Sequence, residues 1–223
     1  MGSFFTNTSF IPTGSIEATV SSAMELLGYH PAENETELHL LNYSKWCTVH
    51  SEFIDEEQLH EALSKCADTV LTISCFDSDF MLLTLTHSGC TETVCVGEPY
   101  EGEDVEIQLT PEHWQPIVGN LDAFRSILNE DYIFAEESLY ALAELFGFDA
   151  AQINVTPDEL LEDPPEDMIT LYYRNANPSE FEKLRSTLLK SIPQMDLESK
   201  VLSKDFSDAL SKLTEMLFSA TET

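Results

Sequence analysis

Two carboxylates separated by one residue are the strongest candidates for chemistry in this sequence. Asp77 and Asp79 flank Ser78 between two apolar runs. Carboxylate oxygens are the ligands that Mg²⁺ and Ca²⁺ prefer, and paired carboxylates also act as general acid and base. One hypothesis is therefore a metal-dependent or carboxylate-based enzyme centred on Asp77 and Asp79. The structural alternative, which we favour, is a turn, because Asp and Ser side chains bond to nearby backbone groups in turns.

Other patterns that carry chemistry are missing from the sequence. The six histidines form neither a His-Glu-x-x-His pattern nor a Cys/His zinc pattern. There is no Gly-x-Ser-x-Gly nucleophile turn, and the first 173 residues contain neither a Gly-rich loop nor a basic cluster that would bind phosphate. We therefore expect no cofactor, and a binding protein rather than an enzyme.

Negative charge is concentrated in one part of the chain. The first 173 residues contain 33 Asp and Glu against three basic residues, Lys45, Lys65 and Arg125, whereas the last fifty residues contain eight acids against seven bases. The net charge of the whole chain is −31. Such a field repels nucleic acid and anionic membranes and attracts basic proteins. The charge therefore excludes direct nucleic-acid and membrane binding and indicates a basic protein as the partner.

This charge suggests an acidic protein that neutralises a basic toxin, nuclease or nucleic-acid-binding protein. Immunity proteins, antitoxins and nucleic-acid mimics work in this way, because carboxylates on a rigid surface imitate phosphates and speed up association. We expect a monomer, since like charges would meet in a homodimer. An alternative is a scaffold that docks another protein through the C-terminal helices. The candidate contact residues lie in two acidic segments: Glu101, Glu103, Asp104, Glu106, Glu162, Asp163, Glu166 and Asp167.

The sequence also indicates a compartment. Its start has no basic segment followed by an apolar core, so we expect no signal peptide, and no apolar run approaches the roughly 18 residues of a membrane span. The five cysteines are odd in number and several fall in apolar strand patterns. Reduced core cysteines are typical of the cytoplasm, where we expect this protein. They are Cys47, Cys66, Cys75, Cys90 and Cys95.

Hydrophobic periodicity predicts alternating groups of strands and helices. The predicted strands are Ser3–Ile11, Glu37–Asn42, Lys45–His50, Thr69–Phe76, Phe80–His87, Thr91–Val96 and Met168–Tyr173. Helices are predicted from about 16 to 27, from Asp55 to about 66, from Thr110, over Ala135–Phe146, from Thr156, from 177 to 191 and from 197 to 218. Asp55 with Gln58 forms a capping box at one of these helix starts.

The order of these elements predicts the fold class. The first six follow the order βαββαβ of a ferredoxin-like split βαβ unit. We therefore expect an α+β fold, with a mainly antiparallel sheet, helices on one face, and a helical C-terminal part. Residues 1–109 would form the sheet region, residues 110–167 a helical extension packed on it, and residues 168–223 a strand with two C-terminal helices. These three parts would make one compact unit.

The first residues of the chain resemble those of a known group of proteins. Met-Gly-Ser-Phe-Phe-Thr-Asn (Met1–Asn7) resembles the start of an uncharacterised bacterial family. Trp46-Cys47-Thr48-Val49, Leu59–Ser64 and Phe76-Asp77-Ser78-Asp79 are similar to a strand, a helix and a turn of that family. The resemblance covers about the first two-thirds of the chain. It implies a bacterial cytoplasmic protein, and it implies no particular chemistry.

Overall fold

The structure, a computed structural model, describes residues 5–43, 45–51, 53–99, 107–148, 156–162 and 164–176. The chain divides into two units, Met1–Arg174 and Asn175–Thr223. All described helices and strands belong to the first unit, apart from the last residue of the final strand. The two predicted C-terminal helices, 177–191 and 197–218, lie outside the described residues.

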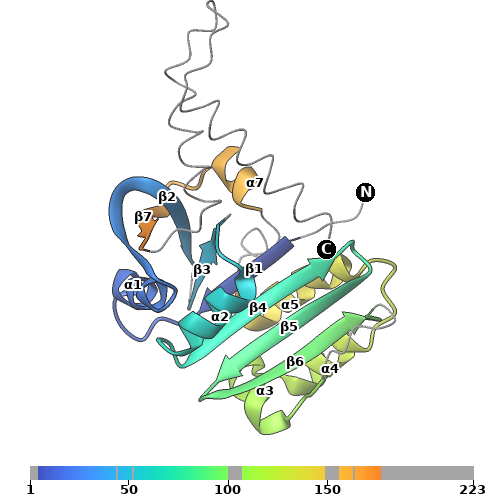
Figure 1. Cartoon of the computed structure of the whole chain (residues 1–223). Helices are drawn as coiled ribbons and strands as arrows, with labels where there is room; N and C mark the ends of the chain where they lie inside the picture. The colour runs from blue at the N-terminus through green and yellow to red at the C-terminus, as the bar shows by residue number, and fades with distance from the viewer. Residues whose placement is uncertain are drawn as a thin grey trace, which may run out of the picture. The chain divides into compact units, whose positions relative to one another are not determined.

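A seven-stranded sheet is the centre of the first unit (Figure 1). Its strand order is β6-β5-β4-β1-β3-β2-β7, and the pairs β6/β5, β5/β4, β4/β1, β1/β3 and β3/β2 are antiparallel. The predicted α+β class with a mainly antiparallel sheet is confirmed. The strands are β1 (Phe5–Phe10), β2 (Tyr29–Tyr43), β3 (Trp46–His50), β4 (Thr69–Phe76), β5 (Phe80–His87), β6 (Cys90–Gly97) and β7 (Ile169–Asn175).

Helices connect and cover these strands. Ser15 caps the first helix by accepting a hydrogen bond from the Ala18 N–H. Asp55 caps the second helix by accepting one from the Gln58 N–H, and this second cap was predicted from the sequence. The helical elements are α1 (Ile16–Leu26), α2 (Glu56–Ser64), α3 (Pro111–Val118), α4 (Leu121–Leu128), the 3₁₀ helix η1 (Ala135–Ser138), α5 (Leu139–Phe146) and α7 (Pro157–Glu162). None of them is long and apolar enough to cross a bilayer within the part of the chain that the structure describes.

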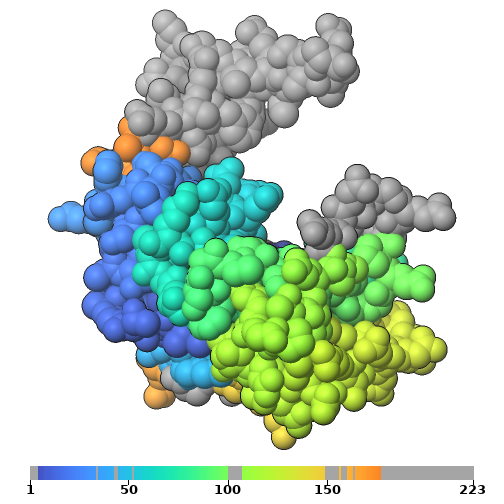
Figure 2. Space-filling model, turned by 90° about the horizontal axis from the view of Figure 1, so that it is seen from below, coloured from blue at the N-terminus to red at the C-terminus, as the bar shows by residue number. Residues whose placement is uncertain are grey.

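The sheet is covered on both faces, so the prediction of helices on one face is wrong. Val70 of β4 packs in a cluster with α1 and α2, whereas Leu71 and Ile73 pack in a second cluster with α3, α4 and α5. Neighbouring strand residues point to opposite faces. Because residues on both faces of β4 are buried, each face has a helical cover. In the space-filling view, α1 and β2 (blue) and α3 and α4 (yellow-green) lie at opposite sides of the unit (Figure 2).

Strand bounds were predicted well and one helix was missed. The bounds of β4 and β5 agree with the prediction, but β2 begins at Tyr29 rather than at Glu37. Helix α4 was not predicted, because it starts only three residues after α3 ends. Asn120 caps α4 by accepting a hydrogen bond from the Ala123 N–H. The βαββαβ element order of the start is observed, with strand order β4-β1-β3-β2, and the ferredoxin-like relationship stays a prediction.

Candidate functional site

The predicted carboxylate pair lies in the tight turn between β4 and β5. The backbone is left-handed at Asp77 (φ 49°) and at Ser78 (φ 62°), the conformation that tight hairpins favour. The side chains of Asp77 and Asp79 are exposed, whereas Ser78 between them is buried. Ser78 Oγ donates a hydrogen bond to Glu136 Oε2 at 3.0 Å, and the Ser78 carbonyl accepts one from the Ala135 N–H at 2.8 Å. The turn is therefore fixed to η1 through its central serine.

Further carboxylates surround this turn. Gly97, at the end of β6, lies so close to it that a Cβ on Gly97 would be 2.5 Å from the Asp79 carbonyl oxygen. The next residue, Glu98, therefore leaves the sheet beside the turn, and η1 brings two more acids. We call this surface the acidic end: Asp77, Asp79, Glu98, Glu136 and Glu137. All of these side chains are exposed except Glu136, which is half-buried.

The described residues place no third metal ligand with the predicted pair. Among the described residues, no three or more His, Cys, Asp and Glu side chains are grouped so that they could hold a metal ion. Exposed carboxylates at the tip of a hairpin are also well hydrated, which weakens any single contact with a cation. The geometry of Asp77 and Asp79 thus supports a role in the turn and on the surface.

Three of the eight predicted contact residues fall in the described parts of the chain. Glu162 ends α7, and Glu166 and Asp167 precede β7. All three side chains are exposed. The other five, Glu101, Glu103, Asp104, Glu106 and Asp163, lie outside the described residues.

The few basic side chains are mostly engaged within the chain. Lys65 Nζ pairs with Glu61 at 2.7 Å, and its hydrogen bond lowers the pKa of Glu61. Arg125 pairs with Asp122 at 3.7 Å. Lys45 donates to the Ile117 carbonyl at 3.2 Å and lies 5.6 Å from the centre of the Trp46 ring. Burial lowers the pKa of Lys45. Arg174 is the remaining Lys or Arg of the described residues.

The basic residues next to the sheet lie away from the acidic end. Lys65 precedes the first residue of β4, whereas Asp77 follows its last residue. Lys45 precedes β3, whose Cys47 pairs with Phe10 at the end of β1 that is remote from the β4–β5 turn. Within the described residues, the turn, Glu98 and η1 themselves contain acidic residues and no Lys or Arg.

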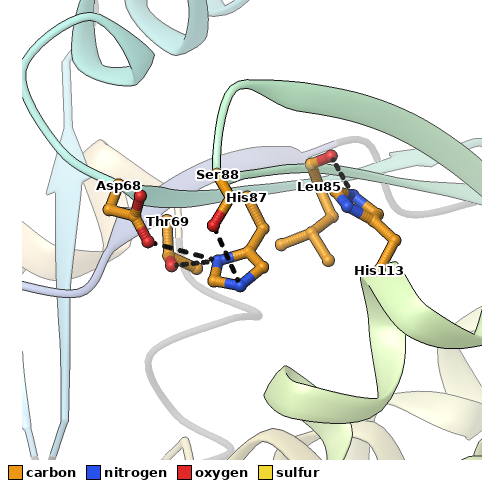
Figure 3. A network of polar contacts seen from close by, with 6 residues as sticks. All are labelled: Asp68, Thr69, Leu85, His87, Ser88 and His113. Atoms are coloured by element: carbon orange, nitrogen blue, oxygen red, sulfur yellow. Dashed lines mark hydrogen bonds and ion pairs between the residues drawn. The ribbon is translucent and has the colours of Figure 1, made fainter.

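A polar cluster at the opposite end of the sheet contains an aspartate, a histidine and a serine (Figure 3). The Nδ1 atom of His87 lies 2.8 Å from Thr69 Oγ1 and 3.5 Å from Asp68 Oδ2, and its Nε2 atom lies 3.5 Å from Ser88 Oγ. A hydrolase triad has the same order of groups. However, Thr69 holds Nδ1 more closely than Asp68 does, and 3.5 Å is the outer limit of a hydrogen bond. The contacts thus connect β4 with β5.

Two buried groups anchor α3 to the sheet beside this cluster. His113 Nε2 donates to the Leu85 carbonyl at 3.2 Å (Figure 3). Glu92 of β6 accepts hydrogen bonds from the Thr110 N–H and from Trp114 Nε1, both at 2.9 Å. Burial alone would raise the pKa of Glu92, but hydrogen bonds from Thr110 and Trp114 and the nearby His113 hold that pKa below its usual value. Glu92 therefore caps α3. The N-cap residue of this helix, Thr110, makes no capping hydrogen bond with its own side chain.

A chain of polar side chains on the other face of the sheet was not predicted from the sequence. Thr8 Oγ1 donates to Glu56 Oε2 at 3.0 Å and lies 2.8 Å from Thr72 Oγ1. His60 bridges Thr72 at Nδ1 and Thr86 at Nε2, both at 2.8 Å. A signal was present in the sequence, since threonines recur on β1, β4, β5 and β6 where apolar residues would be expected in a buried face.

A further buried histidine, His50, belongs to neither of these polar clusters. His50 of β3 is 1% exposed, and among the described residues neither of its ring nitrogens has a hydrogen-bond partner. Burial and the neighbouring His39 lower the pKa of His50 to about 4, so the ring is neutral at physiological pH. A neutral imidazole avoids the cost of burying a charge, although its polar nitrogens remain costly.

Comparisons with known proteins identify no relative of this chain. No protein-family model matches the chain, and no curated protein and no solved structure shows significant similarity to it.

Proposed function

We propose that this protein binds a basic protein through its carboxylates and neutralises it, in the manner of an immunity protein, an antitoxin or a nucleic-acid mimic. The observation that carries the proposal is the acidic end, where five acidic residues from three segments of the chain gather without a Lys or Arg among them. The hydrogen bonds of Ser78 to η1 hold two of these segments in place. A pre-organised surface of one charge loses little entropy when it binds the opposite charge.

The sequence supplies two further acidic segments for the proposed contact. Glu101, Glu103, Asp104 and Glu106 continue the chain from Glu98. The second segment starts at the last residue of α7 and ends before β7; it contains Glu162, Asp163, Glu166 and Asp167. In the proposal both segments contact the partner, which is a toxin, a nuclease or a nucleic-acid-binding protein. In the proposal the protein acts as a monomer in the cytoplasm. The cytoplasmic location agrees with the five cysteines, all of which are free.

Salt dependence tests this proposal. The full-length protein is immobilised and exposed at low salt to a lysate of its source cells, and a basic protein that is recovered stoichiometrically is then purified. Its dissociation constant is measured by calorimetry from about 0.05 M to about 0.5 M salt, where the screening length falls to a few Å. We expect the affinity to fall at least about tenfold over this range. An affinity that stays flat, or the recovery of a mixture of basic proteins without stoichiometry, would contradict charge-based recognition.

A further inference from the structure

The polar chain beneath α2 has one consistent direction of hydrogen bonding. Each threonine hydroxyl has a single hydrogen to donate. An ionised Glu56 can only accept, so Thr8 donates to it. Thr72 must then donate to Thr8, because the hydrogen of Thr8 is already used. The same count requires His60 to donate from Nδ1 to Thr72. The carboxylate thus fixes the tautomer of a histidine that it does not touch.

The direction continues on the far side of the imidazole ring. A neutral histidine that carries its proton on Nδ1 accepts at Nε2, so Thr86 donates to His60. Thr91 must then donate to Thr86, at an O···O distance of 2.7 Å. Thr91 is exposed at the edge strand β6, whereas Thr8, Thr72 and Thr86 are buried. A single file of hydrogen bonds therefore links the surface at β6 with Glu56 on α2.

We propose that this file is a proton-driven relay in which protonation of Glu56 reverses every hydrogen bond and moves the proton of His60 from Nδ1 to Nε2. In the reversed file, the Glu56 hydroxyl donates to Thr8, Thr8 to Thr72, and Thr72 to His60 Nδ1. His60 Nε2 then donates to Thr86, and Thr86 to Thr91. One proton is taken up from water and none is released. The only net change in charge is the neutralisation of Glu56.

The surroundings favour this change within the physiological range of pH. Burial raises the pKa of Glu56 to about 7, an effect that the hydrogen bond from Thr8 opposes and the charge of Asp55 strengthens. Burial lowers the pKa of His60 to about 4. Between these two values, Glu56 is protonated while His60 is still neutral. The ring can therefore change its tautomer in this interval without becoming charged.

Glu56 is the group that titrates in the relay, because the groups packed around it are either uncharged or exposed to solvent. The strands under α2, β1 and β4, present the uncharged hydroxyls of Thr8 and Thr72. The neighbouring helix α1 carries two acids, Glu17 and Glu25, both exposed. On α2 itself, the other charged groups are also exposed: Asp55 at the cap, Glu57, Glu61 and, at its end, Lys65.

Nuclear magnetic resonance of the His60 ring tests the relay. The ¹⁵N chemical shifts of the full-length protein are recorded at about pH 8.5 and about pH 5.5, on either side of the pKa of Glu56. His60→Asn identifies the signals by their loss. We expect the proton on Nδ1 at the higher pH and on Nε2 at the lower pH. An unchanged tautomer at the two values would overturn the proposal, since protonated Glu56 would then leave the file in its original direction.

Two threonine variants separate the relay from general effects of pH. Thr8→Val removes the hydroxyl that connects Glu56 with Thr72, so the His60 tautomer should become the same at both pH values. Thr84→Val is the matched control, because Thr84 is the cross-strand neighbour of Thr72 but bonds only to Thr93 in the described structure. The control should retain the full change. A pH-dependent tautomer in Thr8→Val, or its loss in Thr84→Val, would contradict the relay.

Discussion

The two faces of the sheet are stabilised by different kinds of contact. The face under α3, α4 and α5 holds a continuous aromatic group, in which the rings of Trp114 and Phe124 are 5.1 Å apart and those of Phe124 and Phe146 are 5.7 Å apart. The face under α2 holds the file of threonines around His60. Apolar contacts have no direction, whereas hydrogen bonds between hydroxyls do. The comparison shows how one sheet combines a packed core with a polar path that can respond to protons.

The largest expected effect is on the aromatic face. Phe124 is fully buried, and Phe124→Ala would leave a cavity between Trp114 and Phe146. We expect the free energy of unfolding to fall by about 3–5 kcal/mol. Urea denaturation followed by circular dichroism measures this loss. A loss below about 1 kcal/mol would mean that the aromatic face contributes little to stability.

The next effect concerns the carboxylate that caps α3. Glu92→Ala leaves the Thr110 N–H and Trp114 Nε1 without their acceptor. We expect a loss of about 2–3 kcal/mol in the free energy of unfolding, because hydrogen bonds to a charged group are stronger than neutral ones. Glu92→Gln is the control, since its amide oxygen can still accept and should limit the loss to about half. Equal losses in the two variants would show that the negative charge, and not the acceptor, is what α3 requires.

A smaller effect is expected on the polar face. Thr72→Val keeps the shape of the side chain and removes the hydroxyl between Thr8 and His60. The loss of two buried hydrogen bonds should lower the free energy of unfolding by about 1–2 kcal/mol. Thr84→Val, which affects a half-buried pair, should cost less. If the half-buried threonine proved the more costly of the two, the file would not be a stabilising feature of this face.

The last effect is a change in the pH dependence of stability rather than in stability at a single pH. The pKa of Glu56 is raised in the folded protein, to about 7. Its contribution to stability is therefore fully present below the pKa of the unfolded state, near 4.3, and is lost as pH rises through the folded value. Glu56→Gln should remove this loss, so the variant should gain stability relative to the wild type between about pH 5 and pH 8. Thermal unfolding at several pH values measures the difference. A constant difference across this range would contradict the raised pKa.

Much of the fold could be predicted from the sequence, because its strands alternate strongly and its helices begin with clear caps. Asp55 with Gln58 predicted the start of α2, and the alternation from Thr69 predicted β4. The missed helix α4 has buried residues at helical spacing, Leu121, Phe124 and Ile127, but its eight residues are too few for a clear period. Helices were expected on one face of the sheet only, whereas residues on both faces of β4 are buried.

The candidate sites were less predictable for physical reasons. A charge excess can be counted from residue types alone, but the gathering of Glu98 and Glu136 beside the β4–β5 turn depends on pairing across the sheet. The partner role of the acidic segments stays a prediction. The file around His60 needs the register of β1, β4, β5 and β6, which no single stretch of sequence contains.

The measurement that tests the central claim most directly compares two neutralised surfaces of equal charge. One variant combines Asp77→Asn, Asp79→Asn, Glu98→Gln and Glu137→Gln at the acidic end. The control neutralises four exposed acids on α1 and β2: Glu25→Gln, Glu33→Gln, Glu35→Gln and Glu37→Gln. We expect the acidic-end variant to weaken binding of the purified basic partner about tenfold or more, and the control to weaken it about twofold or less. Equal losses would contradict the claim that the acidic end is the binding surface.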